Sequence, residues 1–440
     1  MKLRLLLLVG SCFSAAPSVG LAQTAADAPI TASEAQLMRA EIAELRAQVE
    51  ALKVAQTKVA ASVQAAPPLP SWKGAPQFSS GESGFTFKPR GQVQVDVGFI
   101  SSPGSAGGAV GPVTGTFGAA GVNTTNLGFN TRLRRINVGA EGSLPGGFGY
   151  LVEFELSQSS VNYEDVILTY QAKGSPLQLR IGYQYPLQSL DQIAGSKFTS
   201  FMERAGNTDA FGNSRRIGIA GTWAKGDLTL STGLFGEDVA NINFARTGWE
   251  TAARATWSPK LDATQLHLGL NLQHRVAPRD AQNVRLRQRP YLQLTDQRFI
   301  DTGRIAADGD DIAGVELGAI AKSLHFAGEA QWLRVRGFND PARAFGANRG
   351  TGGTSAFLAS DPTFFSGYVE LGYFFTGETR GYKGGRWDRT SVLRPFNKGG
   401  WGALQANIRL DHTDFQDRVG AGAITPGSAQ LCERWRPDRL

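Results

Sequence analysis

The sequence predicts an all-β fold, a transmembrane antiparallel β-barrel that follows a short coiled-coil helix. From Phe85 onward, apolar and polar residues alternate with a period of two, as in strands that present one apolar face. The mean hydropathy is −0.20, and no run long and apolar enough for a membrane helix follows Ala22. Short turns alternate with long loops, which is typical of an outer-membrane barrel.

The first residues, Met1–Ala22, are expected to be a signal peptide. Lys2 and Arg4 give a basic start, Leu5–Val9 begins an apolar run, and Gly20–Ala22 supplies small residues at the cleavage position. Removal of the peptide lowers the net charge from +7 to about +5. Because the chain is expected to be exported, we expect no nucleic-acid partner in spite of its net positive charge.

Residues 33–63 are expected to form a helix of the coiled-coil type. Apolar residues recur there at alternating spacings of four and three, namely Met38, Ile42, Leu45, Val49, Leu52 and Val59, with Gln56 in the same series. A seam this short needs partners, so a periplasmic coiled coil that joins subunits is one interpretation. A helix lying against the body of the protein is the other. Residues 64–84 follow as a linker kept extended by its prolines.

Residues 85–420 are assigned to the barrel. Clear alternation places strands at residues 92–99, 135–141, 150–156, 166–170, 177–185, 216–223, 249–257, 266–275, 311–325, 326–337, 363–376 and 401–415. About fourteen strands are expected in all. The turns at Pro145–Gly147, Lys173–Gly174 and Lys225–Gly226 are short, whereas the loops Ser101–Asn126, Pro186–Asn213, Val276–Val284 and Asn339–Pro362 are longer. Trp223, Trp257 and Tyr373 lie near strand ends, as expected of an interfacial aromatic girdle.

The stretch Arg180–Arg204 joins one of these strands to a long charged segment. Pro186 ends the strand, since proline has no N–H for a ladder. The segment beyond it has no clear period and mixes the charged residues Asp191, Lys197, Glu203 and Arg204 with Phe198 and Phe201. Such a loop either carries function or is a solvated surface loop.

Several motifs resemble the phosphate-selective porin family, the O and P porins. They are Arg134-Arg135 with Gly142, Arg180–Pro186, Phe201–Arg204, Phe374–Arg380 and Gly399–Leu404. The resemblance extends from about Phe85 to Phe415 and implies a homotrimer of barrels with roughly sixteen strands. It also implies that the third long loop folds into the lumen, where basic side chains select anions. Lys197 and Arg204 are the matching basic residues of that loop.

Six further arginines are expected to face the lumen by strand parity. They are Arg135, Arg180, Arg216, Arg254, Arg275 and Arg409. Acidic residues such as Glu153, Glu250 and Glu370 share those faces, so the lumen carries mixed charge. The predicted function is therefore a bacterial outer-membrane porin for passive diffusion of small hydrophilic solutes. It is expected to prefer anions weakly if the charged loop lines the narrowest point, and phosphate-type anions are among the expected solutes.

A structural or adhesive barrel is the alternative, with the coiled coil and loops binding a partner. In either case, outer-membrane lipid is expected around the strands. An enzyme is not expected, because Glu153 and Glu155 are typical wall carboxylates and His267 has no evident serine partner. The two cysteines, Cys12 and Cys432, and the four scattered histidines suggest neither a metal site nor a cofactor.

Residues 421–440 do not continue the strand pattern. The alternation ends near Phe415, and the final residues read Cys432-Glu433-Arg434-Trp435-Arg436-Pro437-Asp438-Arg439-Leu440. A truncated or frame-shifted reading frame would give such a tail. Missing C-terminal strands would leave an open edge in lipid, where backbone groups have no partners.

Overall fold

The computed structural model describes residues 31–65 and most of residues 71–417. Its gaps are residues 73, 81–82, 101–127, 158–159, 213, 238–247, 279–281, 290, 296–299, 303–304 and 338–360. The predicted signal peptide and the atypical tail 421–440 lie outside the described residues. The chain divides into two compact units, Met1–Pro68 and Leu69–Leu440, and each is considered by itself.

The first unit contains one long helix, α1 (Ala32–Ala65). A capping box begins it: the Glu34 carboxylate accepts the Thr31 N–H at 3.0 Å, and the Thr31 hydroxyl accepts the Glu34 N–H at 3.3 Å. Ile42, Leu45 and Val49 are about half exposed. The helix expected over residues 33–63 is thus present, while its pairing with other copies stays a prediction.

The second unit is mostly antiparallel sheet. Its first strands are β1 (Ser71–Trp72), β2 (Pro76–Ser79), β3 (Thr86–Ile100), β4 (Gly128–Leu144), β5 (Phe148–Glu155), β6 (Asn162–Tyr170), β7 (Leu177–Gln184), β8 (Arg216–Lys225) and β9 (Leu228–Phe235). The later ones are β10 (Trp249–Trp257), β11 (Lys260–Leu261), β12 (Thr264–Val276), β13 (Asn283–Val284), β14 (Arg287–Gln288), β15 (Ile300–Asp301), β16 (Ile305–Ala321), β17 (Leu324–Gly337), β18 (Thr363–Phe374), β19 (Gly381–Lys383), β20 (Arg386–Asp388) and β21 (Gln405–Asp414). The short helical turns are η1 (Pro145–Gly147), α2 (Leu190–Ile193), α3 (Gly206–Ala210) and η3 (Phe396–Lys398).

Each long strand pairs with the next long strand along the chain. The ladders run antiparallel from β3 through β10, then through β12, β16, β17 and β18 to β21, within one 17-stranded sheet. No ladder joins β21 back to the first strands within the described ranges, so this sheet is open rather than a closed barrel. The predicted closure and the count of sixteen strands therefore stay predictions, and strand β9 was missing from the expected ranges.

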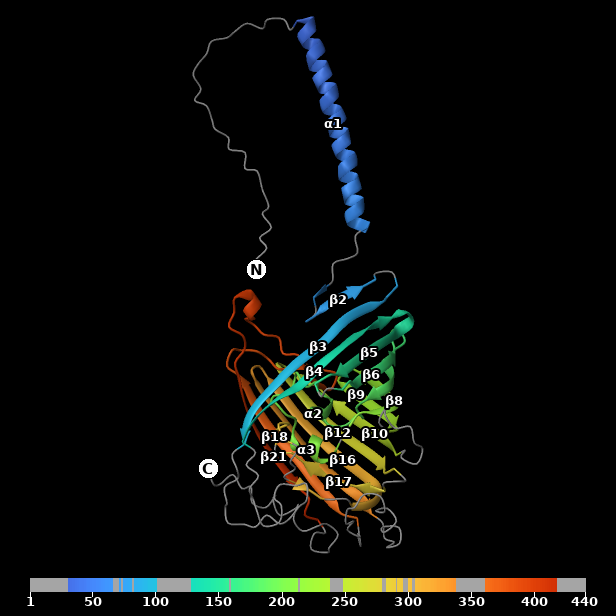
Figure 1. The fold of residues 1–440 in the computed structure, drawn as a ribbon, viewed down its shortest axis with the longest axis vertical. Helices are drawn as coiled ribbons and strands as arrows, with labels where there is room; N and C mark the ends of the chain where they lie inside the picture. Colours follow the sequence, from blue (N-terminus) through green and yellow to red (C-terminus); the bar gives the residue numbers. More distant parts are fainter. Residues whose placement is uncertain are drawn as a thin grey trace. The chain divides into compact units, whose positions relative to one another are not determined.

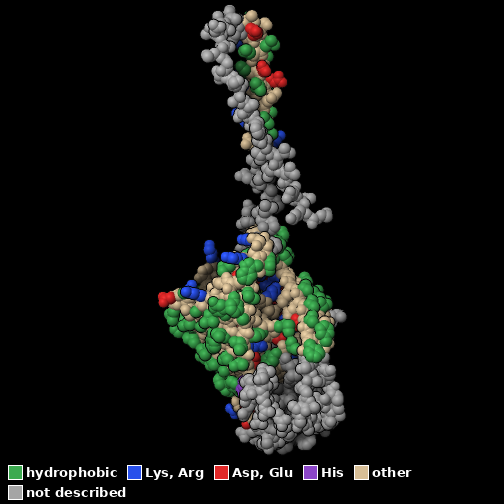
Figure 2. All heavy atoms as spheres, turned by 90° about the vertical axis from the view of Figure 1, so that its left-hand side faces the viewer, with side chains coloured by type: hydrophobic (Ala, Val, Ile, Leu, Met, Phe, Trp, Pro, Cys, Tyr) green, Lys and Arg blue, Asp and Glu red, His purple; other side chains and the backbone are tan. Residues whose placement is uncertain are grey.

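The two faces of the strands are the reverse of those in a water-soluble protein, because apolar side chains point outward and polar side chains point inward. On β12, Leu270 and Leu272 are each 61% exposed, whereas Asn271 and Gln273, which alternate with them, are buried. Figure 2 shows hydrophobic side chains over the outside of the sheet and charged side chains within its hollow. An apolar exterior around a polar interior fits strands that meet lipid on one face. None of the described helices combines the length and apolar composition of a membrane span.

Two chain segments extend into the curve of the sheet. The first, here called the central segment, comprises residues 185–215 and includes α2 and α3 (Figure 1). The second, the hairpin segment, comprises residues 375–404 and includes the β19–β20 hairpin. A buried cluster joins both to the wall strands; it contains Leu190, Ala194, Ala205, Ile320, Ala327, Tyr368 and Trp387. The sequence predicted a long loop at the first position, but it did not predict the inward hairpin.

Candidate functional site

Glu329 and Glu370 are two of the wall carboxylates that hold the central segment. The buried carboxylate of Glu329 on β17 accepts the N–H groups of Leu190 and Asp191 at 3.0 and 2.8 Å. It also accepts the hydroxyl of Tyr368 at 2.9 Å. Farther along, the Ser200 hydroxyl donates to the Glu370 carboxylate on β18 at 2.7 Å. Glu329 therefore holds the backbone of the central segment at Leu190 and Asp191, and Glu370 holds its side chain at Ser200.

A β-bulge on β4 supplies another attachment. The pairing of β3 with β4 shifts between Gln94 and Val95, and the extra residue on β4 is Arg134. The shift turns Arg134 inward together with Arg135, and Arg134 forms an ion pair with Glu203 at 2.9 Å. The neighbouring Arg135 donates to the Gln94 side chain at 2.6 Å. The motif around Arg134 and the motif ending at Arg204 therefore meet in space.

The predicted site residues Arg204 and Arg409 also lie together, and both donate to backbone carbonyls. Arg204 donates to the carbonyls of Asp191 and Ala194, the latter at 2.9 Å. Arg409 donates to the carbonyls of Glu203 and Arg204 at 3.1 and 3.3 Å, and its guanidinium lies over the Phe201 ring. Both guanidinium groups therefore stabilise the shape of the central segment, and their predicted contact with solutes stays a prediction.

Three other predicted arginines are paired with acids on the concave face of the sheet. Arg216 lies 2.8 Å from Glu250, Arg254 lies 2.6 Å from Glu316, and Arg275 lies 2.6 Å from Asp310. Arg254 and Arg275 each donate in addition to an inserted segment, at the carbonyls of Gly385 and Phe211. Their charges are largely offset, and their remaining donors hold the inserted segments to the wall.

Lys197 differs from these arginines, because no ion pair involves it in the part of the chain described. Its ammonium donates to the carbonyl of Gly91 at 3.1 Å. Partial burial and the nearby positive charge of Arg90 lower the pKa of Lys197 below its usual value. Arg180 on β7 likewise has no ion pair in the described residues. Lys197 and Arg180 thus belong with Arg135 and Arg204, whose side chains bond to the Gln94 amide and to backbone carbonyls, as the predicted residues without an ion pair in the described part of the chain.

A cavity of about 310 Å³ lies where the central and hairpin segments meet. Lys197, Arg380 and Arg389 contribute cations to its lining, and Asp388 contributes an anion. Arg380 donates to the Phe198 carbonyl at 3.0 Å, lies over the Trp387 ring and approaches Glu370 at 3.4 Å. No pattern in the sequence singled out Arg380 or Arg389 as a site residue. The only signal for Arg380 was its place at the end of the Phe374–Arg380 motif.

His267 belongs to a buried polar chain. Its Nδ1 lies 2.6 Å from the Tyr382 hydroxyl and its Nε2 lies 3.0 Å from Glu316. The Ser258 hydroxyl lies 2.6 Å from the Tyr382 hydroxyl. The hydrogen bonds from Glu316 through His267 to Tyr382 tie the hairpin segment to the wall. Because His267 is only 1% exposed, its imidazole is not accessible from solvent. No cluster of acids, histidines and cysteines suited to a metal occurs among the residues that the structure describes.

Residues 115–426 match the family model described as phosphate-selective porin O and P. The chain is also 35% identical over 459 residues to an uncharacterized protein of Caulobacter vibrioides, with 95% of this chain and 84% of that protein aligned.

Solved structures with weaker similarity include outer-membrane proteins. The in-vitro folded, trimeric OmpT of Vibrio cholerae is 10% identical, covers 64% of this chain and 92% of its own, and gives a TM-score of 0.29. The OmpF of Salmonella typhi in complex with daunomycin is 10% identical, with coverages of 75% and 98% and a TM-score of 0.30.

Proposed function

This chain belongs to the phosphate-selective porin O and P family, and from this premise we propose that it is a weakly anion-selective outer-membrane porin. Small hydrophilic solutes diffuse through it passively, and phosphate-type anions are among them. The functional unit in this proposal is a homotrimer of closed barrels with about sixteen strands. The helix α1 lies in the periplasm and joins the subunits as a coiled coil.

The observation that carries the anion preference is the distribution of partners among the basic groups. Arg216, Arg254 and Arg275 are each held by a wall carboxylate at 2.6–2.8 Å. In contrast, Lys197 projects from the central segment beside a cavity and has no ion pair among the residues described. Selectivity is set by the charges at the narrowest point, where water screens them least. A central segment that narrows the pore would therefore present an excess of positive charge to the solute.

The predicted pore-lining residues divide into two groups in this proposal. Lys197 and Arg180 act on the solute directly, since their charges are not offset by an ion pair in the described part of the chain. Arg216, Arg254, Arg275 and Arg409 are paired with acids and contribute a weaker field. Arg135 and Arg204 direct their donors to the Gln94 side chain and to backbone carbonyls, and position the strand and the central segment. Mixed charge on the wall supports general anion preference more than specificity for phosphate.

Reversal potentials in a salt gradient across a planar bilayer test this proposal. We expect the wild-type channel to pass chloride more readily than potassium. Lys197→Gln removes a charge whose interaction with an ion about 4 Å away is worth about 1 kcal/mol in water, so the permeability ratio falls severalfold. Lys225→Gln, at a short turn on β8, is the matched control and leaves the ratio unchanged. A cation-selective wild-type channel, or equal ratios for Lys197→Gln and wild type, contradicts the proposal.

A further inference from the structure

The apolar outer face of the sheet continues to the ends of β18 and β21 on the side of the short turns. Tyr373 pairs with Ala406, and beyond this pair the Phe375 N–H donates to the Leu404 carbonyl at 2.9 Å. The side chains of Tyr373, Phe375 and Leu404 are about half exposed or more. An outer-membrane barrel turns its short turns to the periplasm, so in the proposed porin this edge lies at the periplasmic leaflet.

A closed loop begins at this edge, here called the rim loop, and it comprises residues 390–402 with the turn η3. It extends beyond the ends of β18 and β21 (Figure 1). The Gly402 N–H closes it by donating to the Arg394 carbonyl at 2.9 Å. Its base is fixed where the Glu378 carboxylate accepts the Leu393 N–H at 3.1 Å. These bonds preorganise the loop, so a partner binds it at a small cost in conformational entropy.

The rim loop exposes large apolar side chains. Leu393, Phe396 and Trp401 are 63%, 78% and 57% exposed, and the hydrogen bond between Arg394 and Gly402 brings the two arms that carry them together. Such a patch differs from the single apolar residues scattered over most protein surfaces. Aromatic residues are enriched where a membrane meets water. Because the patch adjoins the apolar outer face of the sheet, lipid is the surface that it fits.

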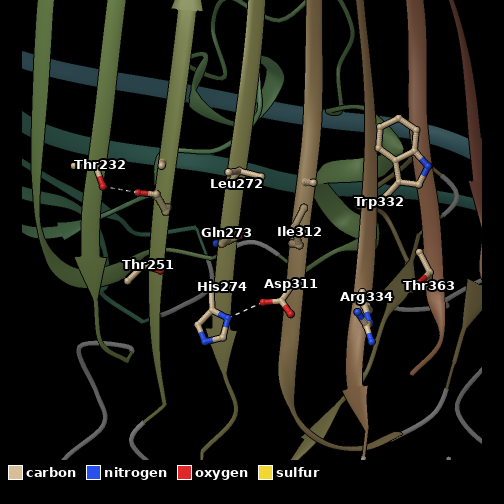
Figure 3. A pocket seen from close by; sticks show the side chains of 13 residues that line it. Thr232, Thr251, Leu272, Gln273, His274, Asp311, Ile312, Trp332, Arg334 and Thr363 are labelled. Carbon is tan, nitrogen blue, oxygen red and sulfur yellow. Dashed lines mark hydrogen bonds and ion pairs between the residues drawn. The ribbon is translucent and has the colours of Figure 1, made fainter. Parts of the chain in front are cut away.

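Two cations of the rim loop have no acidic partner in the part of the chain that the structure describes. Arg394 and Lys398 are exposed and take part in no ion pair or side-chain hydrogen bond there, and residues 390–404 contain no aspartate or glutamate. At the opposite ends of the strands, exposed charges are paired instead, as His274 is with Asp311 at 2.6 Å (Figure 3). Unpaired cations beside exposed aromatic rings are suited to anionic lipid headgroups.

We propose that the rim loop binds an anionic phospholipid of the periplasmic leaflet. Arg394 and Lys398 contact the lipid phosphate, while Phe396 and Trp401 lie among the upper parts of the acyl chains. A zwitterionic phospholipid offers the same acyl chains but carries an ammonium beside its phosphate, so it binds less well. The inference rests on the membrane location of the proposed porin and is independent of its ion selectivity.

Fluorescence quenching by lipids with brominated acyl chains tests this proposal. The full chain is reconstituted in phosphatidylethanolamine vesicles with a minor fraction of phosphatidylglycerol, and equal amounts of one lipid or the other carry the bromine. The difference between wild type and Trp401→Phe isolates the quenching of Trp401. We expect brominated phosphatidylglycerol to quench Trp401 more strongly. Arg394→Gln combined with Lys398→Gln lowers this preference about fivefold or more, because each basic residue near an anionic surface contributes a factor of about five.

Lys53→Gln combined with Lys58→Gln on α1 is the control with the same change in net charge, and it leaves the preference unchanged. If the double variant of the rim loop forms no channels, Lys398→Gln alone replaces it and lowers the preference about fivefold. Equal quenching of Trp401 by the two lipids, or no quenching by either, overturns the proposal. A changed oligomeric mass of the rim-loop variant also overturns it, because the loop would then contact another copy.

Two tryptophans on the outer face of the sheet separate this proposal from the porin function. Trp257 and Trp332 are 51% and 44% exposed, and brominated lipid quenches them in Trp401→Phe if the strands lie in the membrane. Such quenching without any contribution from Trp401 overturns the role of the rim loop alone. Absence of all quenching overturns the membrane location and with it both proposals. A lipid preference at Trp401 in a channel without anion preference contradicts the ion selectivity alone.

Discussion

The ion pair between Arg134 and Glu203 offers a direct test of how the central segment is held. Two contacts, at 2.9 and 3.3 Å, join the guanidinium to the carboxylate. The two side chains are 17% and 9% exposed. We consider Arg134→Met, Glu203→Gln and the double variant. Removing one member of a buried pair leaves the other charge without its partner, which typically costs about 3–5 kcal/mol.

The expected loss of unfolding free energy is lower than that range, because the concave face is polar and Arg134 keeps some exposure. We expect about 2–3 kcal/mol for each single variant. The double variant should lose less than the sum of the two, with a coupling energy of about 1–2 kcal/mol, since removing both charges leaves neither one unpaired. Urea unfolding of the detergent-solubilised protein, followed by tryptophan fluorescence, measures these differences.

The more exposed pair Lys88–Glu141 provides a control that also involves β4. It joins β3 to β4 at 2.8 Å, but its side chains are 23% and 33% exposed, so its coupling energy should be about 0.5–1 kcal/mol at most. Additive losses for Arg134→Met and Glu203→Gln would refute the reasoning, as would single losses under about 0.5 kcal/mol. Either result would mean that the bulge at Arg134 does not anchor the central segment.

Two further predictions concern charge and assembly. Because the pKa of Lys197 is lowered, its side chain loses its charge at a lower pH than an ordinary lysine does. The anion preference should therefore decline as the pH rises through this alkaline range. Reversal potentials of Lys197→Gln should not show that decline. Leu45→Asp on α1 places a charge on the expected coiled-coil seam and should abolish trimers in size-exclusion chromatography, whereas the exposed substitution Glu44→Gln should not; unchanged trimers in Leu45→Asp would remove α1 from the assembly.

The sequence predicted which face of a strand each side chain occupies far better than it predicted contacts between strands. Alternation alone correctly placed Asn271 on the inner face and Leu270 on the outer face, because side-chain direction has a fixed period of two. Parity failed at Arg134, where one extra residue turns two successive arginines inward. No pattern in the sequence announces such a bulge before the partner strand is known.

Strand parity also could not predict which acids pair with the basic residues, for a related reason. Arg254 and Glu316 are 62 positions apart, and their contact depends on the registers of β10, β12 and β16 together. The hairpin segment was missed because residues 375–404 show no sustained alternation and their strands are only three residues long. A register shift of one residue would turn every side chain to the other face, so contacts of this kind follow only from the assembled sheet.

The basic residues of the concave face have two different roles, which are to hold the inserted segments and to present charge to a solute. The arginines of the wall pair with acids, and several also donate to the carbonyls of inserted segments, as Arg254 does at Gly385 and Arg409 does at Glu203. A planar guanidinium with five donors can satisfy a carboxylate and a carbonyl at once, whereas an ammonium is a compact point charge on a flexible chain. Lys197, which lacks an ion pair among the described residues, is therefore suited to act on a passing anion. For the proposed porin, counting basic residues on the concave face would overestimate the expected anion preference, because most of that charge is paired with acids or with carbonyls of the inserted segments.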